Sequence, residues 1–517
     1  MKKRSLALLL AATMMLSGIC GCGKEETEEQ AQTITEETAT TEVEGEAETS
    51  DKYEINFDEE PYEAVLMYWV ANDARDVESV EEAFNELTMK QLNMKVDLQP
   101  VTFGGYMQQI QMILSSDDKL DIFPMFGSNA GTYINAEYVE DITPYLNSVA
   151  KDLIDVVGIE DISCCSIGDF IWGIPTMHER CNPTAYVLCT DVLEETGYKA
   201  EDIKTLEDLT EVFAKVKELY PEMIAYSGLN GSTQGATQQT FDSLGGGNYG
   251  VLMDNGQELT VSNWYESEEF RSVVETYYEW AQKGYSSADL ATSSDAGEAM
   301  MRAGNLFSFS TYWKPNTKVE KDAQTGCDTT IVRMTEPFCC SAATNSVGYS
   351  IASNSEDPEK AALLLNWIYK TKEANDLLNW GIEGVDYTVL EDGTIGYPEG
   401  INADNVGYHQ DFGWAQPNQY NSYVWTGNEI DIWEQYQEMR NNALVSKAYG
   451  FNFDTTPVLN EISALTAVSD QYLVTIAAGA VEPEQAIKEF NDALYNAGLQ
   501  TVMDEKQKQL DEWYAVQ

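Results

Sequence analysis

The sequence predicts an α/β fold, because three strand patterns alternate with two helical patterns where the folded part begins. Residues 64–70 form a continuous apolar run, which is typical of a strand buried on both faces of a sheet. Further strands are predicted at 95–101 and 121–126, and helices with one apolar stripe at 77–93 and 106–115. Because strands joined through helices run in the same direction, this order predicts a largely parallel sheet.

The chain changes character from Asp191 onward, where longer helical patterns are joined by loops rich in glycine, asparagine and tyrosine. The run from Gly245 to Tyr249 predicts a flexible turn, and without G-x-G-x-x-G spacing it is not a phosphate-binding loop. A chain of 517 residues is long enough for two or three domains. The predicted helices of this part are 206–219, 267–283, 358–371 and 429–443.

The first 22 residues have the layout of a secretory signal. Met1 to Arg4 is basic, residues 6–16 are apolar, and small residues lead to Cys22. The apolar part is shorter than the roughly 20 residues that a membrane-spanning helix needs. The segment resembles a bacterial lipoprotein signal, in which a cysteine after a small residue is lipidated and begins the mature chain. We therefore expect residues 1–21 to be a signal peptide and Cys22 to be the lipidation site. An ordinary cleaved signal is the alternative.

The next segment, residues 22–60, is predicted to be the lipidated cysteine followed by an acidic tether. Residues 24–51 consist almost entirely of Glu, Thr, Ala and Gln. Such a segment buries too little apolar surface to offset the entropy lost on ordering, so we expect it to be disordered. Nothing later in the sequence has a long uncharged apolar run. The expected location is the outer face of the cell membrane, with the lipid as the sole membrane anchor.

Charge and composition exclude several functions. The net charge of −57, from 87 acidic and 30 basic residues, argues against nucleic-acid binding, which needs clustered lysine and arginine. Of the nine cysteines, seven remain once Cys20 and Cys22 are set aside, and this odd number without regular spacing is not a disulfide framework. We interpret most of these seven as small buried apolar residues, which suggests a reducing or anoxic habitat. With two histidines and no C-x-x-C motif, neither a metal site nor a cofactor is predicted.

Catalytic motifs are also missing from the sequence. There is no G-x-S-x-G or H-E-x-x-H motif. Glycoside hydrolysis needs a pair of carboxylates, but with 87 acidic residues almost any two could form one, so such a pair does not indicate catalysis. Cys181 lies near His178, but nothing marks it as a nucleophile. We therefore expect a binding protein and not an enzyme.

Aromatic and polar residues at strand ends and in loops are suited to sugars, whose rings have apolar faces and hydrogen-bonding hydroxyls. Trp69 and Trp172 are equally compatible with a place in the core. Ser128 and Asn129 follow the third strand, where ligands meet the carboxyl end of a parallel sheet, although a simple turn is the alternative. Arg180 can bond a ligand or pair with Glu179. The candidate ligand-binding residues are Trp69, Tyr106, Ser128, Asn129, Trp172, Arg180, Trp313, Glu383, Trp414 and Asn418.

Several motifs in order along the chain resemble those of one protein family, the extracellular solute-binding lipoproteins of ABC importers. The resemblance is to the large carbohydrate-type receptors of Gram-positive bacteria, which have a distinctive C-terminal module. The motifs that carry it are 103–109, 168–175, 205–209, 304–308 with 312–314, 378–387, 449–454 and 507–513.

This resemblance implies a two-lobed fold of the periplasmic-binding-protein type, with a ligand cleft between lobes joined by crossover strands. Lobe 1 is expected to comprise 61–178 and 335–375, and lobe 2 to comprise 179–334 and 376–517 with the C-terminal module. The implied function is capture of a carbohydrate, in our interpretation an oligosaccharide, by a monomer that delivers it to an ABC permease. A peptide ligand is the main alternative, followed by a glycan-active enzyme and by a surface adhesin or sensor.

Overall fold

The computed structural model describes residues 54–71, 74–116, 118–181, 183–228, 240–287, 290 and 296–517. The predicted signal peptide, Cys22 and most of the predicted tether lie outside these residues. One compact unit spans Lys52–Gln517, and the structure below is that of this unit.

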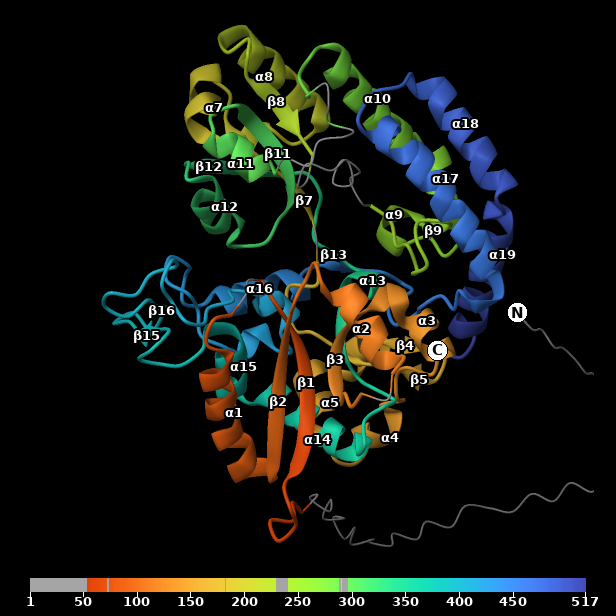
Figure 1. Ribbon diagram of the computed structural model, residues 1–517. Coiled ribbons are helices and arrows are strands. Elements are labelled where there is room, and N and C mark those ends of the chain that lie inside the picture. Colours follow the sequence, from red (N-terminus) through yellow and green to blue (C-terminus); the bar gives the residue numbers. More distant parts are fainter. Residues whose placement is uncertain are drawn as a thin grey trace, which may run out of the picture. The chain divides into compact units, whose positions relative to one another are not determined.

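Lobe 1 is built on a five-stranded sheet with the order β2-β1-β3-β14-β6, the lower sheet of Figure 1. β1 runs parallel to both β2 and β3, as the sequence predicts, whereas β14 returns antiparallel between β3 and β6. The strands are β1 (Tyr62–Val70), β2 (Met94–Thr102), β3 (Ile122–Phe126), β6 (Ile174–Pro175) and β14 (Val347–Ile351).

Helices cover both faces of this sheet. α1 presents Val80 and Phe84 to the core and ends at Asn93, which adopts the left-handed conformation that closes many helices. A short hairpin of β4 (Ser166–Ile167) and β5 (Phe170–Ile171) follows α6. The helices are α1 (Val77–Leu92), α2 (Tyr106–Leu114), α3 (Ala130–Asn135), α4 (Thr143–Leu146), α5 (Asp152–Val157), α6 (Ile159–Ser163), α14 (Pro358–Lys370) and α15 (Lys372–Trp380).

Lobe 2 has a four-stranded sheet with the order β12-β7-β11-β8. α8 begins at Thr205 with a capping box, in which the side chains of Thr205 and Asp208 each bond the other's backbone N–H. The strands are β7 (Thr184–Cys189), β8 (Ile224–Ser227), β11 (Leu306–Tyr312) and β12 (Thr329–Arg333). The helices are α7 (Thr190–Thr196), α8 (Leu206–Leu219), α10 (Glu268–Gln282), α11 (Gly297–Arg302) and α12 (Thr317–Thr325).

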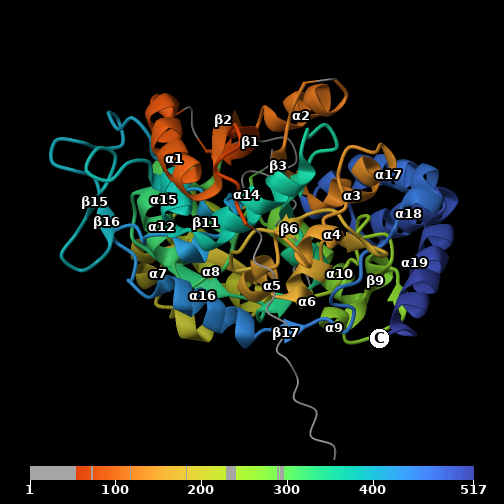
Figure 2. The same cartoon turned by 90° about the horizontal axis from the view of Figure 1, so that it is seen from below.

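The C-terminal helices α17 (Leu459–Ala477), α18 (Pro483–Asn496) and α19 (Leu499–Tyr514) pack beside α10 of lobe 2, and Figures 1 and 2 show them together at one edge of the unit. Their core residues, among them Phe490 and Leu510, pack with Trp264 and Phe270. The small elements α9 (Met253–Gly256), β9 (Val251–Leu252) and β10 (Val261–Ser262) complete this region.

Three segments cross between the lobes. The first joins β6 to β7, the second joins β12 to β14, and the third follows α16 (Ile432–Asn441). In the second and third, β13 (Phe338–Cys339) pairs with β17 (Leu444–Val445), and α13 (Ser341–Thr344) follows β13. A disulfide joins Cys181 in the first crossing to Cys339 in the second, with the two Cα atoms 5.2 Å apart. The interpretation of the cysteines as mostly free thiols is therefore wrong for this pair, because the fold brings together residues that are far apart in sequence.

The predicted boundary assigns residues 376–517 to lobe 2, but the first part of this range packs on lobe 1. Leu378 and Tyr408 belong to the lobe-1 core, and the Tyr408 hydroxyl bonds that of Tyr68 at 3.0 Å. The reason is that α15 follows α14 directly and covers the same sheet. A hairpin of β15 (Thr388–Val389) and β16 (Ile395–Gly396) projects beside it (Figure 1).

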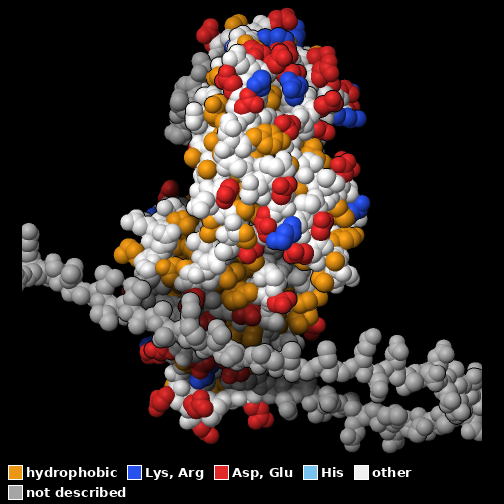
Figure 3. All heavy atoms as spheres, turned by 90° about the vertical axis from the view of Figure 1, so that its right-hand side faces the viewer, with side chains coloured by type: hydrophobic (Ala, Val, Ile, Leu, Met, Phe, Trp, Pro, Cys, Tyr) orange, Lys and Arg blue, Asp and Glu red, His pale blue; other side chains and the backbone are white. Residues whose placement is uncertain are grey.

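The surface reflects the acidic composition, since Figure 3 shows acidic side chains spread over one face with few basic ones among them. Among the described residues, no helix combines the length and the apolar character that crossing a membrane requires.

Candidate functional site

A cavity of about 310 Å³ lies where lobe 1, the second crossing, lobe 2 and the C-terminal segment meet, and we call it the glycine cavity. Its size is at the lower end of the range of small-molecule sites. The described residues that line it include no charged side chain. The lining residues are Gly127, Ser128, Ala130, Gly131, Ile167, Trp172, Ser243, Gly245, Gly246, Gly247, Ala342, Asn345, Ser346, Asn452, Phe453 and Thr455.

Glycines and short polar side chains make up most of the residues that line this cavity, and Ile167, Trp172 and Phe453 are its larger apolar groups. Gly127 follows β3, and the Asn345 carbonyl would lie 2.3 Å from a Cβ at this position, so only glycine fits. On the lobe-2 side, Leu244 and the three glycines after it all have positive φ, a conformation that glycine adopts without strain. The cavity therefore offers short hydrogen-bonding groups and little bulk.

An aromatic cluster on lobe 1 begins beside the glycine cavity, at Phe126 before Gly127. Phe126 contacts Trp69 with ring centroids 4.7 Å apart, and Phe103 lies 5.6 Å from Phe126. Trp414 follows, with its ring 6.1 Å from that of Phe103. Phe103 is 46 % exposed, so this end of the cluster faces solvent.

A second cavity, of about 360 Å³, begins at Trp414, and we call it the tryptophan cavity. Four tryptophans line it together with groups that carry charge. Trp380 Nε1 is buried and has no hydrogen-bond partner among the described residues, so it can donate to a ligand. The lining residues are Lys314, Asn316, Glu320, Ala323, Gln324, Asn379, Trp380, Asp411, Phe412, Gly413, Trp414, Gln419, Val424, Trp425, Asn428, Trp433 and Tyr436.

The charged groups of the tryptophan cavity offset one another. Lys314 Nζ lies 2.7 Å from a carboxylate oxygen of Glu320. Burial opposes the charge on Lys314, but Glu320 and other acidic neighbours outweigh it and raise the pKa of this lysine. Burial raises the pKa of Asp411, and the Glu320 carboxylate adds to this shift. Among the described residues that line this cavity, no cation is therefore free to bind an anionic ligand.

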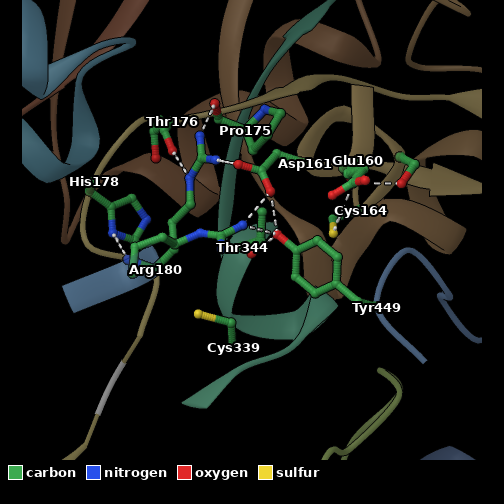
Figure 4. A network of polar contacts seen from close by, with 12 residues as sticks. Glu160, Asp161, Cys164, Pro175, Thr176, His178, Arg180, Cys339, Thr344 and Tyr449 are labelled. Atoms are coloured by element: carbon green, nitrogen blue, oxygen red, sulfur yellow. Dashed lines mark hydrogen bonds and ion pairs between the residues drawn. The ribbon is translucent and has the colours of Figure 1, made fainter. Parts of the chain in front are cut away.

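The three crossings are held together by a polar network around Asp161 of α6 (Figure 4). Arg180 of the first crossing bonds one carboxylate oxygen of Asp161 and also donates to the Thr176 carbonyl at 2.9 Å. Arg440 in the last turn of α16 and the Tyr449 hydroxyl of the third crossing both donate to the other oxygen, each at 2.5 Å. Because two arginines share one carboxylate in a partly buried site, this network fixes the crossings relative to lobe 1.

The structure brings together several of the residues predicted to bind ligand. Ser128 and Trp172 line the glycine cavity, and Trp414 lines the tryptophan cavity. Trp69 and Tyr106 are almost fully buried behind the aromatic cluster, with their rings 5.0 Å apart. They therefore support the exposed rings from below.

The remaining predicted residues lie elsewhere. Asn129 is partly exposed and donates weakly to the Met107 sulfur, while Trp313 packs beside the disulfide with Arg333 4.9 Å above its ring. Arg180 belongs to the Asp161 network and has no ion pair with Glu179 among the described residues. Glu383 is exposed and forms an isolated β-bridge with Tyr387. Asn418 is buried and donates to the Tyr369 carbonyl at 2.7 Å.

Sequence reasoning missed the glycine run 245–247, because it was compared only with phosphate-binding loops. It also missed Asn345 and Asn452, which reach the cavity from segments distant in sequence. Phe103 and Phe453 lie within motifs that carry the family resemblance, and this was the one signal that could have identified them.

Comparison with known proteins agrees with this architecture. Residues 74–375 match the family of bacterial extracellular solute-binding proteins, and residues 447–515 match a domain of unknown function, DUF3502. The chain belongs to the bacterial extracellular solute-binding protein family. This membership confirms the prediction of a binding protein that acts outside the cell membrane.

Particular relatives are similar along almost the whole chain. A carbohydrate ABC transporter substrate-binding protein of Streptococcus pneumoniae is 23% identical over 463 residues, which are 87% of this chain and 90% of the relative. The crystal structure of the N-glycan transport solute binding protein NgtS from the same species has a TM-score of 0.76 at 22% identity, covering 87% of this chain and 98% of that one. NgtS in complex with Man5GlcNAc has a TM-score of 0.69 at 22% identity, covering 87% and 98%. The predicted two-lobed α/β fold is confirmed.

Proposed function

We propose that this protein captures an uncharged oligosaccharide outside the cell and delivers it to the permease of an ABC importer. The observation that carries the proposal is the glycine cavity, which offers backbone, hydroxyl and amide groups and has no charged side chain among its described lining residues. Such groups bond sugar hydroxyls, which both donate and accept hydrogen bonds. The aromatic cluster beside the cavity suits the apolar faces of sugar rings.

The length of the site supports an oligosaccharide over a single sugar. The glycine cavity meets the aromatic cluster at Phe126, and the cluster reaches the tryptophan cavity at Trp414. A chain of linked rings can occupy both cavities and cross the exposed Phe103 between them. The similar carbohydrate-binding protein of S. pneumoniae and the NgtS complex with a glycan support the same ligand class.

Charge argues against the alternative ligands. A free peptide and an anionic glycan both carry ionised groups, which would lose their hydration in a cavity without a counter-charge. Lys314 is the one lysine or arginine among the described residues that line the two cavities, and it is already paired with Glu320. We therefore expect neutral glycans to bind more tightly than acidic glycans of the same length.

The decisive experiment is calorimetry of the purified protein with neutral oligosaccharides, their acidic counterparts, monosaccharides and short peptides. Man5GlcNAc, the glycan named for one similar structure, belongs in the neutral set. Saturable binding of a neutral glycan, with the glycan recovered unchanged, supports the proposal. Binding of peptides alone would contradict the carbohydrate ligand, and cleavage of the glycan would contradict a pure binding function.

The membrane anchor is part of the proposal. We infer that residues 1–21 are removed, that Cys22 is lipidated, and that a monomer is held by this lipid at the outer face of the cell membrane. The Cys22→Ala variant should then leave the membrane fraction, while Cys20→Ala stays. Mass spectrometry of the mature N-terminus provides an independent check, and an unmodified Cys22 in membrane-bound protein would contradict the anchor.

A further inference from the structure

A buried lysine in the C-terminal module holds the glycine-rich loop that forms one wall of the glycine cavity. Lys506 of α19 is fully buried, and its Nζ donates to the carbonyl oxygens of Ser243, Gly247 and Gly250 at 2.9, 3.0 and 2.9 Å. An ammonium group has three N–H donors, so these acceptors use all of them. One side chain therefore bonds residues 243–250 near both ends.

The same loop is held from its other side by the segment that follows the third crossing. The Phe453 backbone N–H donates to the Leu244 carbonyl at 2.9 Å, and the Phe453 ring lies 5.4 Å from Lys506 Nζ. A Cβ at Gly246 would lie 2.9 Å from Thr455 and 3.0 Å from Phe453. The loop thus packs directly on the C-terminal module, and its glycines permit this approach.

This segment is in turn attached to lobe 1. The Asn452 amide donates to the carbonyl oxygens of Cys164 and Ser166 at 2.7 and 2.9 Å, and Asn135 donates to the Thr456 hydroxyl at 2.7 Å. The C-terminal module therefore connects the lobe-2 wall of the glycine cavity to the lobe-1 wall.

The position of Lys506 is costly, which favours a specific role over simple packing. No ion pair of Lys506 is found in the described part of the chain, and a buried charge without one is destabilising unless hydrogen bonds offset it. Burial lowers the pKa of this lysine to about 7, with the buried Asp242 carboxylate opposing the shift. An apolar side chain would fill the same space in the helix core without this cost, but it would leave three carbonyl groups unpaired.

We propose that the C-terminal module, whose matching domain has no assigned function, positions the cavity loop for ligand binding, and that Lys506 is its positioning residue. Within the described part of the chain, the backbone N–H groups of Gly245, Gly246 and Gly247 meet no acceptor, so they are available to sugar hydroxyls. Lys506 holds the carbonyl side of the loop and thereby fixes where these donors lie. This inference rests on the proposed function, since it assigns the loop to the same ligand.

The test compares Lys506→Met with a matched control in the same helix, Leu510→Ala, which removes a buried core side chain but none of the hydrogen bonds to the loop. Hydrogen exchange of peptides covering 243–250 and the affinity for Man5GlcNAc, or for a neutral glycan that binds more tightly in the panel, are both measured well below the melting temperature. Lys506→Met should speed exchange in the loop and weaken binding, each at least tenfold. Leu510→Ala should change both less than about twofold, even at an equal loss of thermal stability.

Lys506→Gln keeps two N–H donors and should show intermediate values, which keeps the test usable if the Met variant does not fold. Suppose that the wild type binds the glycan. Loop exchange and affinity that are unchanged in Lys506→Met or Lys506→Gln would then overturn this inference but not the proposed function. Equal losses in Leu510→Ala would overturn it as well, since they would show a general effect of stability. A wild type that binds no glycan would instead overturn the proposed function.

Discussion

The glycine cavity and the tryptophan cavity differ in what they offer a ligand. The first is lined mainly by glycines and short polar side chains from separate stretches of chain, and its described lining residues carry no charge. The second is lined by four tryptophans from the segment after α14, together with a paired lysine and buried acids. The comparison suggests that the two cavities bind different parts of a glycan. The glycine cavity would bond sugar hydroxyls, and the tryptophan cavity would stack on the apolar faces of sugar rings.

The largest effect is expected from Gly246→Ala in the glycine cavity. The new Cβ would lie 2.9 Å from Thr455 at a residue whose φ is +68°, so the loop must move. We expect glycan affinity to fall by about 30- to 100-fold, or roughly 2–3 kcal/mol, by calorimetry. Gly304→Ala is the matched control, because Gly304 has a similar φ of +75° and open space around it. Equal losses in both variants would show that the effect is only one of backbone strain.

The next effect concerns the aromatic side of the comparison. Trp414→Ala removes the ring that joins the aromatic cluster to the tryptophan cavity. Loss of its contact area should weaken binding of a long glycan by about 10- to 50-fold, or roughly 1.4–2.3 kcal/mol. A disaccharide confined to the glycine cavity should be almost unaffected. Phe57→Ala, which removes an exposed ring that lines neither cavity, is the control. Equal losses for both ligands would contradict two separate subsites.

The tryptophan cavity should also have its own pH dependence. His409 packs behind it, 5.3 Å from the Trp380 ring and 4.4 Å from that of Trp425, and burial lowers its pKa to about 4. The unfolded chain binds this proton near pH 6.5, so between about pH 6.5 and 4 protonation favours unfolding and stability falls as the pH falls. The contribution is about 3 kcal/mol at most, because each tenfold difference in proton affinity corresponds to about 1.4 kcal/mol.

The measurement is the melting temperature of wild type and His409→Phe from pH 7 to 4. The difference between the two proteins should shift in favour of the variant as the pH falls through this window. A difference that is independent of pH would contradict the assignment. This readout needs no ligand, so it tests the cavity apart from the proposed function.

The smallest effect is expected from Ser128→Ala, which removes one hydroxyl from the rim of the glycine cavity. Loss of a single neutral hydrogen bond should weaken glycan binding about two- to tenfold, or roughly 0.5–1.5 kcal/mol. Ser116→Ala, at an exposed serine outside both cavities, is the control. No loss in Ser128→Ala would assign Ser128 to a simple turn, the alternative that its sequence position left open.

Much of the fold follows from local patterns, and the site follows from them less well. α8 has the predicted bounds because a capping box and an apolar stripe both specify them, and α10 differs by one residue at each end. Trp69 and Trp414 both lie near polar loops, yet one is fully buried and the other lines a cavity. That difference depends on which segments pack over them, which a local pattern does not contain.

The polar residues show the same limit. Arg180 pairs with Asp161, 19 positions earlier, and not with its neighbour Glu179. The disulfide joins cysteines 158 positions apart. The loop that contains Gly245 to Gly247 is held in place by Phe453 and Lys506, which lie more than 200 positions later. Among the sequence observations, only the family resemblance could indicate such long-range contacts, because it relates this chain to proteins that share the same fold.

The core shared by residues 241–274 and 448–510 has a consequence for how the chain acquires its structure. Phe241, Trp264 and Phe270 pack on one another and share their core with apolar residues from the last 70 or so positions of the chain. Contacts between residues so far apart in sequence form slowly, because the entropy of closing a long loop is lost before the contacts stabilise the structure. A nascent chain therefore cannot complete this region until its final helices have emerged. We expect this region to reach its final packing only after the last helices have been synthesised.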